Sequence, residues 1–214
     1  MRFGAQKETL VKSSSKGAPP TITRQSSGFE QFCSTLRSKE GLSILDMSGV
    51  SQANISFITE MGHRISSDDV VGTMQECFGA DFLEAQQSST IAQRFLEQTL
   101  TFPEEFFDAA LVWDALQLLV SPLLELTVER LLRVMRPGGQ MLVFFNADEK
   151  AKQIPVYNYR IQDQKTLLQI ARAGAHYQRS QFFNNRSLEK MFQKAASVKF
   201  FLTRDHLREV IVRR

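Results

Sequence analysis

Apolar residues recur at two different spacings along the chain, and these spacings predict alternating helices and strands. Over residues 29–38 the apolar positions lie three or four residues apart, at Phe29, Phe32, Cys33 and Leu36. This spacing places them on one face of a helix. Gly41 ends that pattern, and the short apolar run 42–45 predicts a buried strand that ends at Asp46.

The next two elements have recognisable boundaries. Ser51 is a suitable N-cap for a second helix, and Gly62 is the residue type that commonly follows a helix C-terminus. A second strand over 63–67 runs into the acids Asp68 and Asp69. Further along, the pattern predicts a helix over 91–100, a strand over 107–113, a helix over 121–135, a turn at 137–139 and a strand over 141–145. Strands alternating with helices favour a parallel sheet covered on both faces.

The C-terminal third has a different character. Residues 157–161 are predicted to be extended and to be followed by helical or irregular structure. A helix is expected from Asn185 or Ser187 through Phe192. Two β-rich runs over 198–203 and 207–213 are close enough in sequence to form an antiparallel pair at the end of the sheet.

The charge is unevenly distributed. The chain of 214 residues has a formal net charge of +3, but residues 1–28 hold five basic residues and one acid. We expect this Ser-, Gly- and Pro-rich segment to be a disordered basic tail, with an organelle transit peptide as the alternative. The body over 29–214 is then close to neutral, which argues against a nucleic-acid partner.

Cysteine usage and hydropathy restrict the cellular setting. Cys33 and Cys77 form no C-x-x-C pair, so we expect no metal site and a cytoplasmic location. The most apolar stretch, residues 109–126, is interrupted by polar residues and a proline, so no membrane span is expected.

Acids follow several of the predicted strands. Asp46, Asp69 and Asp114 each come at or just after a strand end. The carboxyl ends of parallel strands meet at one edge of a sheet, where open α/β folds bind ligands. An acid after the second strand accepts hydrogen bonds from ribose hydroxyls in dinucleotide folds. The pattern therefore favours a nucleotide or nucleoside ligand.

Three further features lie in the same segment as the strand-end acids, from Leu42 to Phe145. They are the pair Phe107-Asp108, the helix that follows and the turn Arg136-Pro137-Gly138-Gly139. In this order the residues resemble the class I S-adenosylmethionine-dependent methyltransferases, in particular the methyltransferase type 11-like group. The resemblance implies a Rossmann-like, doubly wound, mostly parallel seven-stranded sheet whose last strand is antiparallel, within one domain over 29–214. It also implies methyl transfer from S-adenosyl-L-methionine, here to an unidentified acceptor, either a small molecule or a protein.

The resemblance assigns a role to each candidate cofactor-binding residue. Asp69, or Asp68 one position earlier, would bind the ribose. The loop from Asp46 to Ser51 would lie beside the methionine part of the cofactor, and Asp114 would lie near the ligand. The complete set is Asp46, Ser48, Gly49, Ser51, Asp68, Asp69 and Asp114. No catalytic base and no oligomeric state are assigned.

The loop after the first strand departs from the family pattern. Ser48, Val50 and Gln52 stand where the family has three glycines, and Gly49 is out of register. A β-branched valine is costly at the positive φ that glycine permits. The alternative to an enzyme is therefore a non-catalytic interaction or regulatory module that has lost cofactor binding. A third hypothesis, a nicotinamide-dependent oxidoreductase, lacks the required G-x-G-x-x-G fingerprint.

Overall fold

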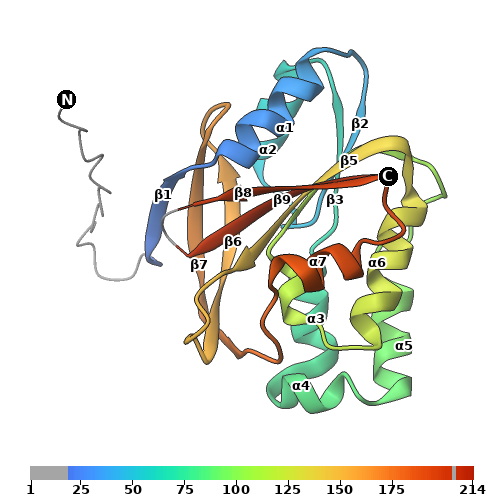
Figure 1. Cartoon of the computed structure of the whole chain (residues 1–214), viewed down its shortest axis with the longest axis vertical. Helices are drawn as coiled ribbons and strands as arrows, with labels where there is room; N and C mark the ends of the chain where they lie inside the picture. The colour runs from blue at the N-terminus through green and yellow to red at the C-terminus, as the bar shows by residue number, and fades with distance from the viewer. Residues whose placement is uncertain (1–18, 204–205) are drawn as a thin grey trace.

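The main sheet has six strands in the order β3-β2-β4-β5-β9-β8 (Figure 1). The computed structural model describes residues 19–203 and 206–214. The strands are β2 (Ser43–Asp46), β3 (Arg64–Ser67), β4 (Phe107–Trp113), β5 (Met135–Asn146), β8 (Ser197–Leu202) and β9 (Leu207–Arg213). Strands β3, β2, β4 and β5 are parallel, β9 runs antiparallel to β5, and β8 pairs antiparallel with β9. The carboxyl ends of the parallel strands therefore lie at one edge.

Helices cover both faces of this sheet. One face packs against α1 (Ser27–Arg37) and α2 (Gln52–Glu60). The other packs against α3 (Val70–Phe78), α4 (Phe82–Ala85), α5 (Ser89–Gln98), α6 (Leu123–Val134) and α7 (Asn185–Met191), with short 3-10 turns η1 (Gly79–Asp81) and η2 (Ala115–Leu118). Along β4, Leu111 and Trp113 belong to the first core and Val112 to the second. The predicted α/β, doubly wound, mostly parallel architecture is confirmed.

A second sheet of three antiparallel strands lies beside the main one. It consists of β1 (Thr21–Gln25), β6 (Gln153–Ile161) and β7 (Thr166–Gln178), in the order β1-β7-β6. We call it the closing sheet. Tyr159, Ile161 and Leu167 from this sheet join the same hydrophobic core as Phe29 and Trp113. The closing sheet is therefore part of the folded body, and it lies beside the main sheet (Figure 1), with Val156 joining the core of the other face.

Two local predictions are corrected by the closing sheet. The disordered tail was expected to extend to residue 28, but Thr21–Gln25 pair with β7 and α1 begins at Ser27. Tertiary pairing and the burial of Arg24 order this polar segment; residues 1–18 of the predicted tail lie outside the described part. The stretch after Ile161 was expected to be helical or irregular, whereas residues 166–178 form β7.

The main sheet also has one strand fewer than the seven expected. Between β3 and β4 the chain forms α3, η1, α4 and α5, and β3 stands at the edge of the sheet. The sequence between these two strands favours helices, so no strand extends the sheet beyond β3 within the described residues. The last strand of the chain, β9, is antiparallel as predicted.

Several element boundaries agree with the sequence signals. The Ser51 side chain accepts a hydrogen bond from the Asn54 backbone N–H and caps α2. Gly62 follows that helix with φ of 83°. The strand predicted over 107–113 has those bounds, and β8 and β9 form the expected antiparallel pair.

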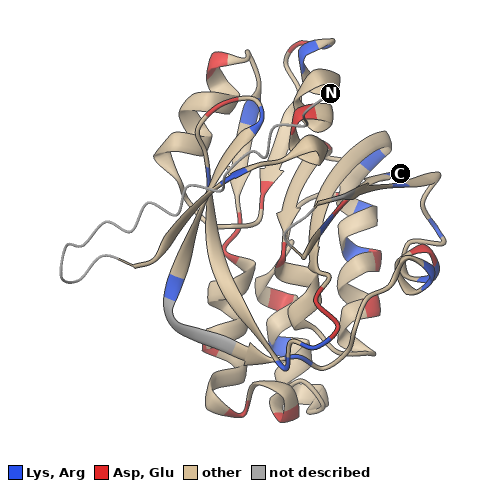
Figure 2. Cartoon of the chain, turned by 60° about the vertical axis from the view of Figure 1, so that its left-hand side comes forward, with Lys and Arg blue, Asp and Glu red and all other residues tan. Residues whose placement is uncertain are grey.

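Charged residues are distributed over the helices and loops, with both signs interspersed (Figure 2). On α6, for example, Glu125 and Glu129 precede Arg130 and Arg133. Within the described part of the chain, each helix is too short or too polar to cross a bilayer.

Candidate ligand site at the carboxyl edge

Asp46 ends β2 and is fully buried. Its carboxylate accepts hydrogen bonds from the Trp113 indole N–H (2.7 Å), the Asn54 amide (2.6 Å), and both the backbone N–H (3.0 Å) and hydroxyl (2.8 Å) of Ser48. Burial raises the pKa of Asp46, while the bonds from Asn54 and Trp113 oppose that rise. The carboxylate therefore organises the loop from inside the protein.

Trp113 at the end of β4 is covered by the closing sheet. It has a positive φ of 55°, and its ring lies parallel to that of Tyr159, at 4.7 Å between centroids and 1° between planes. Asn54 binds the same strand through its side chain: its amide donates to the Tyr159 carbonyl (3.1 Å) and accepts from the Ile161 N–H (2.8 Å). β6 is thus fastened directly over the ends of β2 and β4.

The loop after β2 has its one left-handed residue at Gly49 and exposes Val50. Gly49 has the positive φ (83°), and Val50 projects into solvent with 83% of its surface exposed. Ser51 caps α2 and its hydroxyl accepts from Arg160 of β6 at 3.3 Å. Val50 itself does not have a positive φ, so the β-branched side chain causes no backbone strain here.

Asp68 and Asp69 point to different partners. The Asp68 carboxylate accepts from the Leu100 N–H at 2.8 Å, and burial raises the pKa of that carboxyl. Asp69 caps α3 by accepting from the Gly72 N–H at 2.9 Å, and a β-bridge links it to Ser48. Of the two acids, Asp69 is the one that faces the loop after β2.

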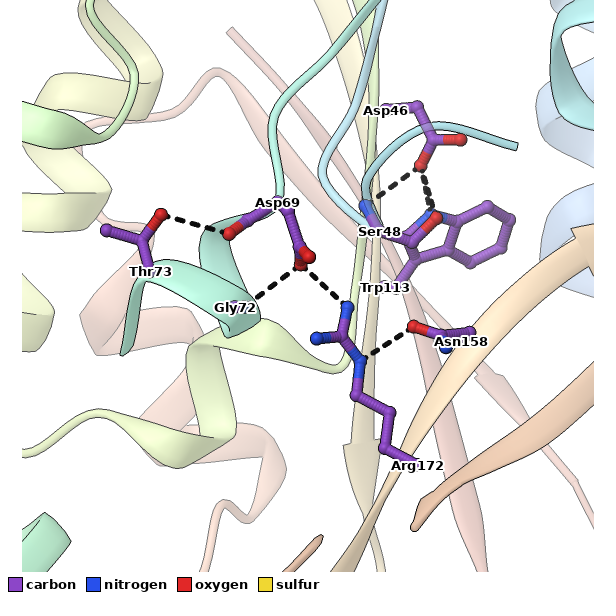
Figure 3. A network of polar contacts seen from close by, with 8 residues as sticks. All are labelled: Asp46, Ser48, Asp69, Gly72, Thr73, Trp113, Asn158 and Arg172. Atoms are coloured by element: carbon purple, nitrogen blue, oxygen red, sulfur yellow. Dashed lines mark hydrogen bonds and ion pairs between the residues drawn. The ribbon is translucent and has the colours of Figure 1, made fainter. Parts of the chain in front are cut away.

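Arg172 of β7 occupies the space in front of Asp69 (Figure 3). Its Nη2 donates to Asp69 Oδ1 at 2.6 Å, and its Nε donates to Asn158 Oδ1 at 2.6 Å. The Arg172 side chain is only 13% exposed, whereas that of Asp69 is 49% exposed. The guanidinium therefore binds one carboxylate oxygen of Asp69, the same atom that caps α3.

Asp114 lies just beyond β4 and is buried. Burial raises the pKa of Asp114 to about 7, and the nearby Tyr159 hydroxyl opposes that rise. Asp114 therefore faces the closing sheet.

The structure brings the predicted residues together at the carboxyl edge of the sheet, one group in the loop after β2 and the other formed by the acids that follow β3 and β4. Asp46, Ser48 and Ser51 belong to the loop after β2, and Gly49 packs between them and Asp69. The sequence did not indicate Asn158, Tyr159 or Arg172, because these residues come from β6 and β7, which carry no motif for this edge.

The side chains of the closing sheet contact the candidate cofactor-binding residues at this edge. Arg172 satisfies Asp69, and the Trp113–Tyr159 stack fills the space next to Asp46. Two cavities of about 230 and 510 Å³ are lined by other residues, the first including Leu96 and Arg130 and the second Glu30 and Arg37. In the described part of the chain, no three His, Cys, Asp or Glu side chains cluster closely enough to hold a metal ion.

Comparison with known proteins identifies the architecture. No protein-family model matches the chain, and no curated protein matches it. Among solved structures, the PH0226 protein from Pyrococcus horikoshii superposes with a TM-score of 0.51 at 14% identity, covering 87% of both chains. The chain shares the overall fold of this protein.

Two further solved structures to which the chain shows similarity are named as methyltransferases. A 1,6-didemethyltoxoflavin-N1-methyltransferase from Burkholderia thailandensis, solved with S-adenosylhomocysteine, has a TM-score of 0.48 at 14% identity, over 88% of this chain and 78% of its own. A SAM-dependent methyltransferase from Methanosarcina mazei has a TM-score of 0.46 at 13% identity, over 82% and 93%. At such identities the likeness concerns the fold.

Proposed function

We propose that this chain is a non-catalytic protein with a methyltransferase fold, acting as an interaction or regulatory module. The observation that carries the proposal is the ion pair between Arg172 and Asp69. In the family that the sequence resembles, the acid at this position is the one that binds the donor's ribose. Here the acid is bound by the chain's own guanidinium.

Two further features support the proposal. The positions that hold glycines in the family hold Ser48, Val50 and Gln52, and the positive φ of this loop is at Gly49 instead. The indole of Trp113 lies against Tyr159 and donates to Asp46, so aromatic side chains fill the space beside the loop. A fold that keeps its core but fills its own ligand edge is suited to presenting a surface to a partner protein.

Isothermal titration calorimetry with S-adenosylmethionine and S-adenosylhomocysteine tests the proposal. We expect no saturable heat for either ligand at concentrations up to about 1 mM, which corresponds to a binding free energy weaker than about −4 kcal/mol. Saturable binding with a one-to-one stoichiometry would overturn it.

Methyl transfer to a small molecule or a protein is the second candidate, and the shared fold together with the position of Asp69 favours it. It requires the closing sheet to move away from the edge. The same titration decides between the two functions, because an enzyme of this class must bind the donor, whereas the interaction module does not.

A further inference from the structure

The β8 strand forms one lateral border of the main sheet. It pairs with β9 from Ser197 to Leu202 in an unbroken register, and within the described part of the chain no strand pairs with its other side. The backbone N–H and C=O groups on that side can therefore bind a further strand. Proteins commonly protect such a border with proline, a bulge or several charges, whereas the segment from Val198 to Phe201 contains a single lysine.

Apolar side chains accompany this border on both faces of the sheet. Val198, Phe200 and Met191 pack, partly exposed, against the core on the α7 side. Phe201 packs against the core on the α1 side, and the Lys199 ammonium group lies 4.9 Å from the centre of its ring. Because alternate side chains of a strand point to opposite faces, an added strand would extend both of these layers.

A cavity of about 510 Å³ lies on the α1 side of the same border, and Glu30 and Phe201 are part of its lining. Phe201 is in register with Glu209, whose carboxylate accepts a hydrogen bond from the Gly28 N–H. The Phe201 position is therefore level with the first turn of α1, which contains Glu30. Arg37 also lines the cavity, but it stands seven residues after Glu30, about 10 Å further along the helix. The end of the cavity beside Phe201 thus presents a carboxylate and suits a cation.

The β8 sequence is complementary to itself in one antiparallel register. Directly opposed residues of an antiparallel pair point to the same face, so two β8 strands related by a two-fold axis must pair with the axis at a residue. Two such registers pair nearly the whole strand. An axis at Lys199 opposes two ammonium groups, which is destabilising. An axis at Phe200 opposes the two Phe200 rings and places each Lys199 opposite the other copy's Phe201, where Glu30 is close.

We propose that β8 is a homodimerisation edge. Two copies of the chain join their main sheets by antiparallel pairing of β8 with the two-fold axis at Phe200, and Lys199 of each copy enters the cavity of the other beside Glu30. The interface is isologous, so each of these contacts occurs twice. The dimer goes beyond the proposed function, because it uses a lateral border of the sheet and forms whether or not the carboxyl edge binds a ligand.

Sedimentation velocity of the full chain without added ligand tests the proposal. We expect the mass to rise from that of one chain to that of two between about 1 and about 300 µM. Lys199→Glu and Glu30→Lys each place like charges at both symmetry-related contacts, so each variant alone should raise the dimer dissociation constant at least about 10-fold. Both side chains are exposed, so the fold should be retained, which far-ultraviolet circular dichroism verifies.

An equimolar mixture of the two variants separates a contact between copies from a contact within one copy. In the mixed dimer both contacts again join a carboxylate to an ammonium group, because the reversal in one copy meets the opposite reversal in the other. We expect the mixture to dimerise with about the dissociation constant of the natural protein. Arg64→Glu is the matched control, because Arg64 is an exposed cation of β3 at the opposite border of the sheet, and it should leave the dissociation constant unchanged.

Three results would overturn the proposal. The first is the mass of a single chain at about 300 µM, which would leave β8 to a different partner. The second is a dimer that neither charge reversal weakens. The third is a mixture that dimerises no better than either variant alone, which would show that Lys199 and Glu30 do not meet across two copies. Each result is independent of the titrations with S-adenosylmethionine, so the dimer and the proposed function can fail separately.

Discussion

Arg172 donates to Asp69 across 103 positions of sequence, and this ion pair ties β7 to the first turn of α3. Because Arg172 also holds Asn158, one guanidinium links both long strands of the closing sheet to the end of β3. The edge at which open α/β sheets bind ligands is thereby closed by the chain itself.

Removal of this guanidinium should destabilise the protein. We expect Arg172→Ala to lower the free energy of unfolding by about 1 to 2 kcal/mol, since a charged hydrogen bond is lost but Asp69 is half exposed. Urea denaturation measures the change. Arg133→Ala is the control, because the Arg133–Glu104 pair is 58% and 72% exposed and should contribute less than about 0.5 kcal/mol. Equal effects of the two variants would contradict the structural role of Arg172.

A methyl group at Gly28 should disturb the buried carboxylate of Glu209. A Cβ there would lie 2.8 Å from Glu209 Oε2, the atom that accepts from the Gly28 N–H at 2.6 Å. We expect Gly28→Ala to cost about 1 to 3 kcal/mol through overpacking. Thermal unfolding measures it, with Ser34→Ala on the exposed side of α1 as the control. A Gly28→Ala protein as stable as the parent would show that Glu209 has room to move.

An amide cannot replace the Asp46 carboxylate. The groups around it, from Trp113, Asn54 and Ser48, all donate hydrogen bonds, and the NH₂ of an asparagine would face at least one of these donors. We expect Asp46→Asn to cost about 2 to 4 kcal/mol in urea denaturation. Asp81→Asn, at an exposed position, should be nearly neutral, and a neutral Asp46→Asn would refute the assigned bonding.

Stability should fall as the pH rises from about 4 to about 7. The pKa of Asp114 is 3.8 when exposed and about 7 in the fold, so the folded protein binds more protons than the unfolded chain in this window. The stabilisation is present in full below the lower value and is lost as the pH passes through the upper one. Burial shifts the pKa values of Asp46 and Asp68 in the same direction. Urea midpoints measured against pH should decline less in Asp114→Asn; an identical decline would exclude Asp114 as a source.

The Cys33 thiol should be unreactive in the folded protein. It is 1% exposed, and burial raises its pKa to about 12, so almost no thiolate is present at neutral pH. We expect labelling of Cys33 by a disulfide reagent to be at least about 100-fold slower than in urea. Mass spectrometry of the labelled peptides separates Cys33 from Cys77, and fast labelling of Cys33 without denaturant would contradict its burial.

The parts of the fold that local signals specify were predictable from sequence. Ser51 and Gly62 mark the ends of α2, and the apolar run 107–113 is β4. β7 was not predicted because its sequence after Gln169 contains Ala, Arg and Gln without the alternation of apolar and polar residues that is typical of a strand. Pairing with β1 and β6 decides its conformation instead.

The same limit applies to the site. Strand-end acids were found because each follows an apolar run, so their common edge is a consequence of parallel topology. Arg172 and Tyr159 reach that edge only through the placement of the closing sheet, which no spacing along the sequence encodes. Whether an acid meets a ligand or a neighbouring side chain is therefore a tertiary property.

The closing sheet has a consequence for biosynthesis. β1 is synthesised before β7. The hydrogen bond from Arg24 to Gln169 therefore forms only after a further 145 residues have been added, and that from Gly28 to Glu209 only after 181. Contacts so distant in sequence form slowly, and until they form the aromatic surface around Trp113 is uncovered. A nascent chain that lacks β7 would therefore leave this apolar surface uncovered until the closing sheet has been synthesised.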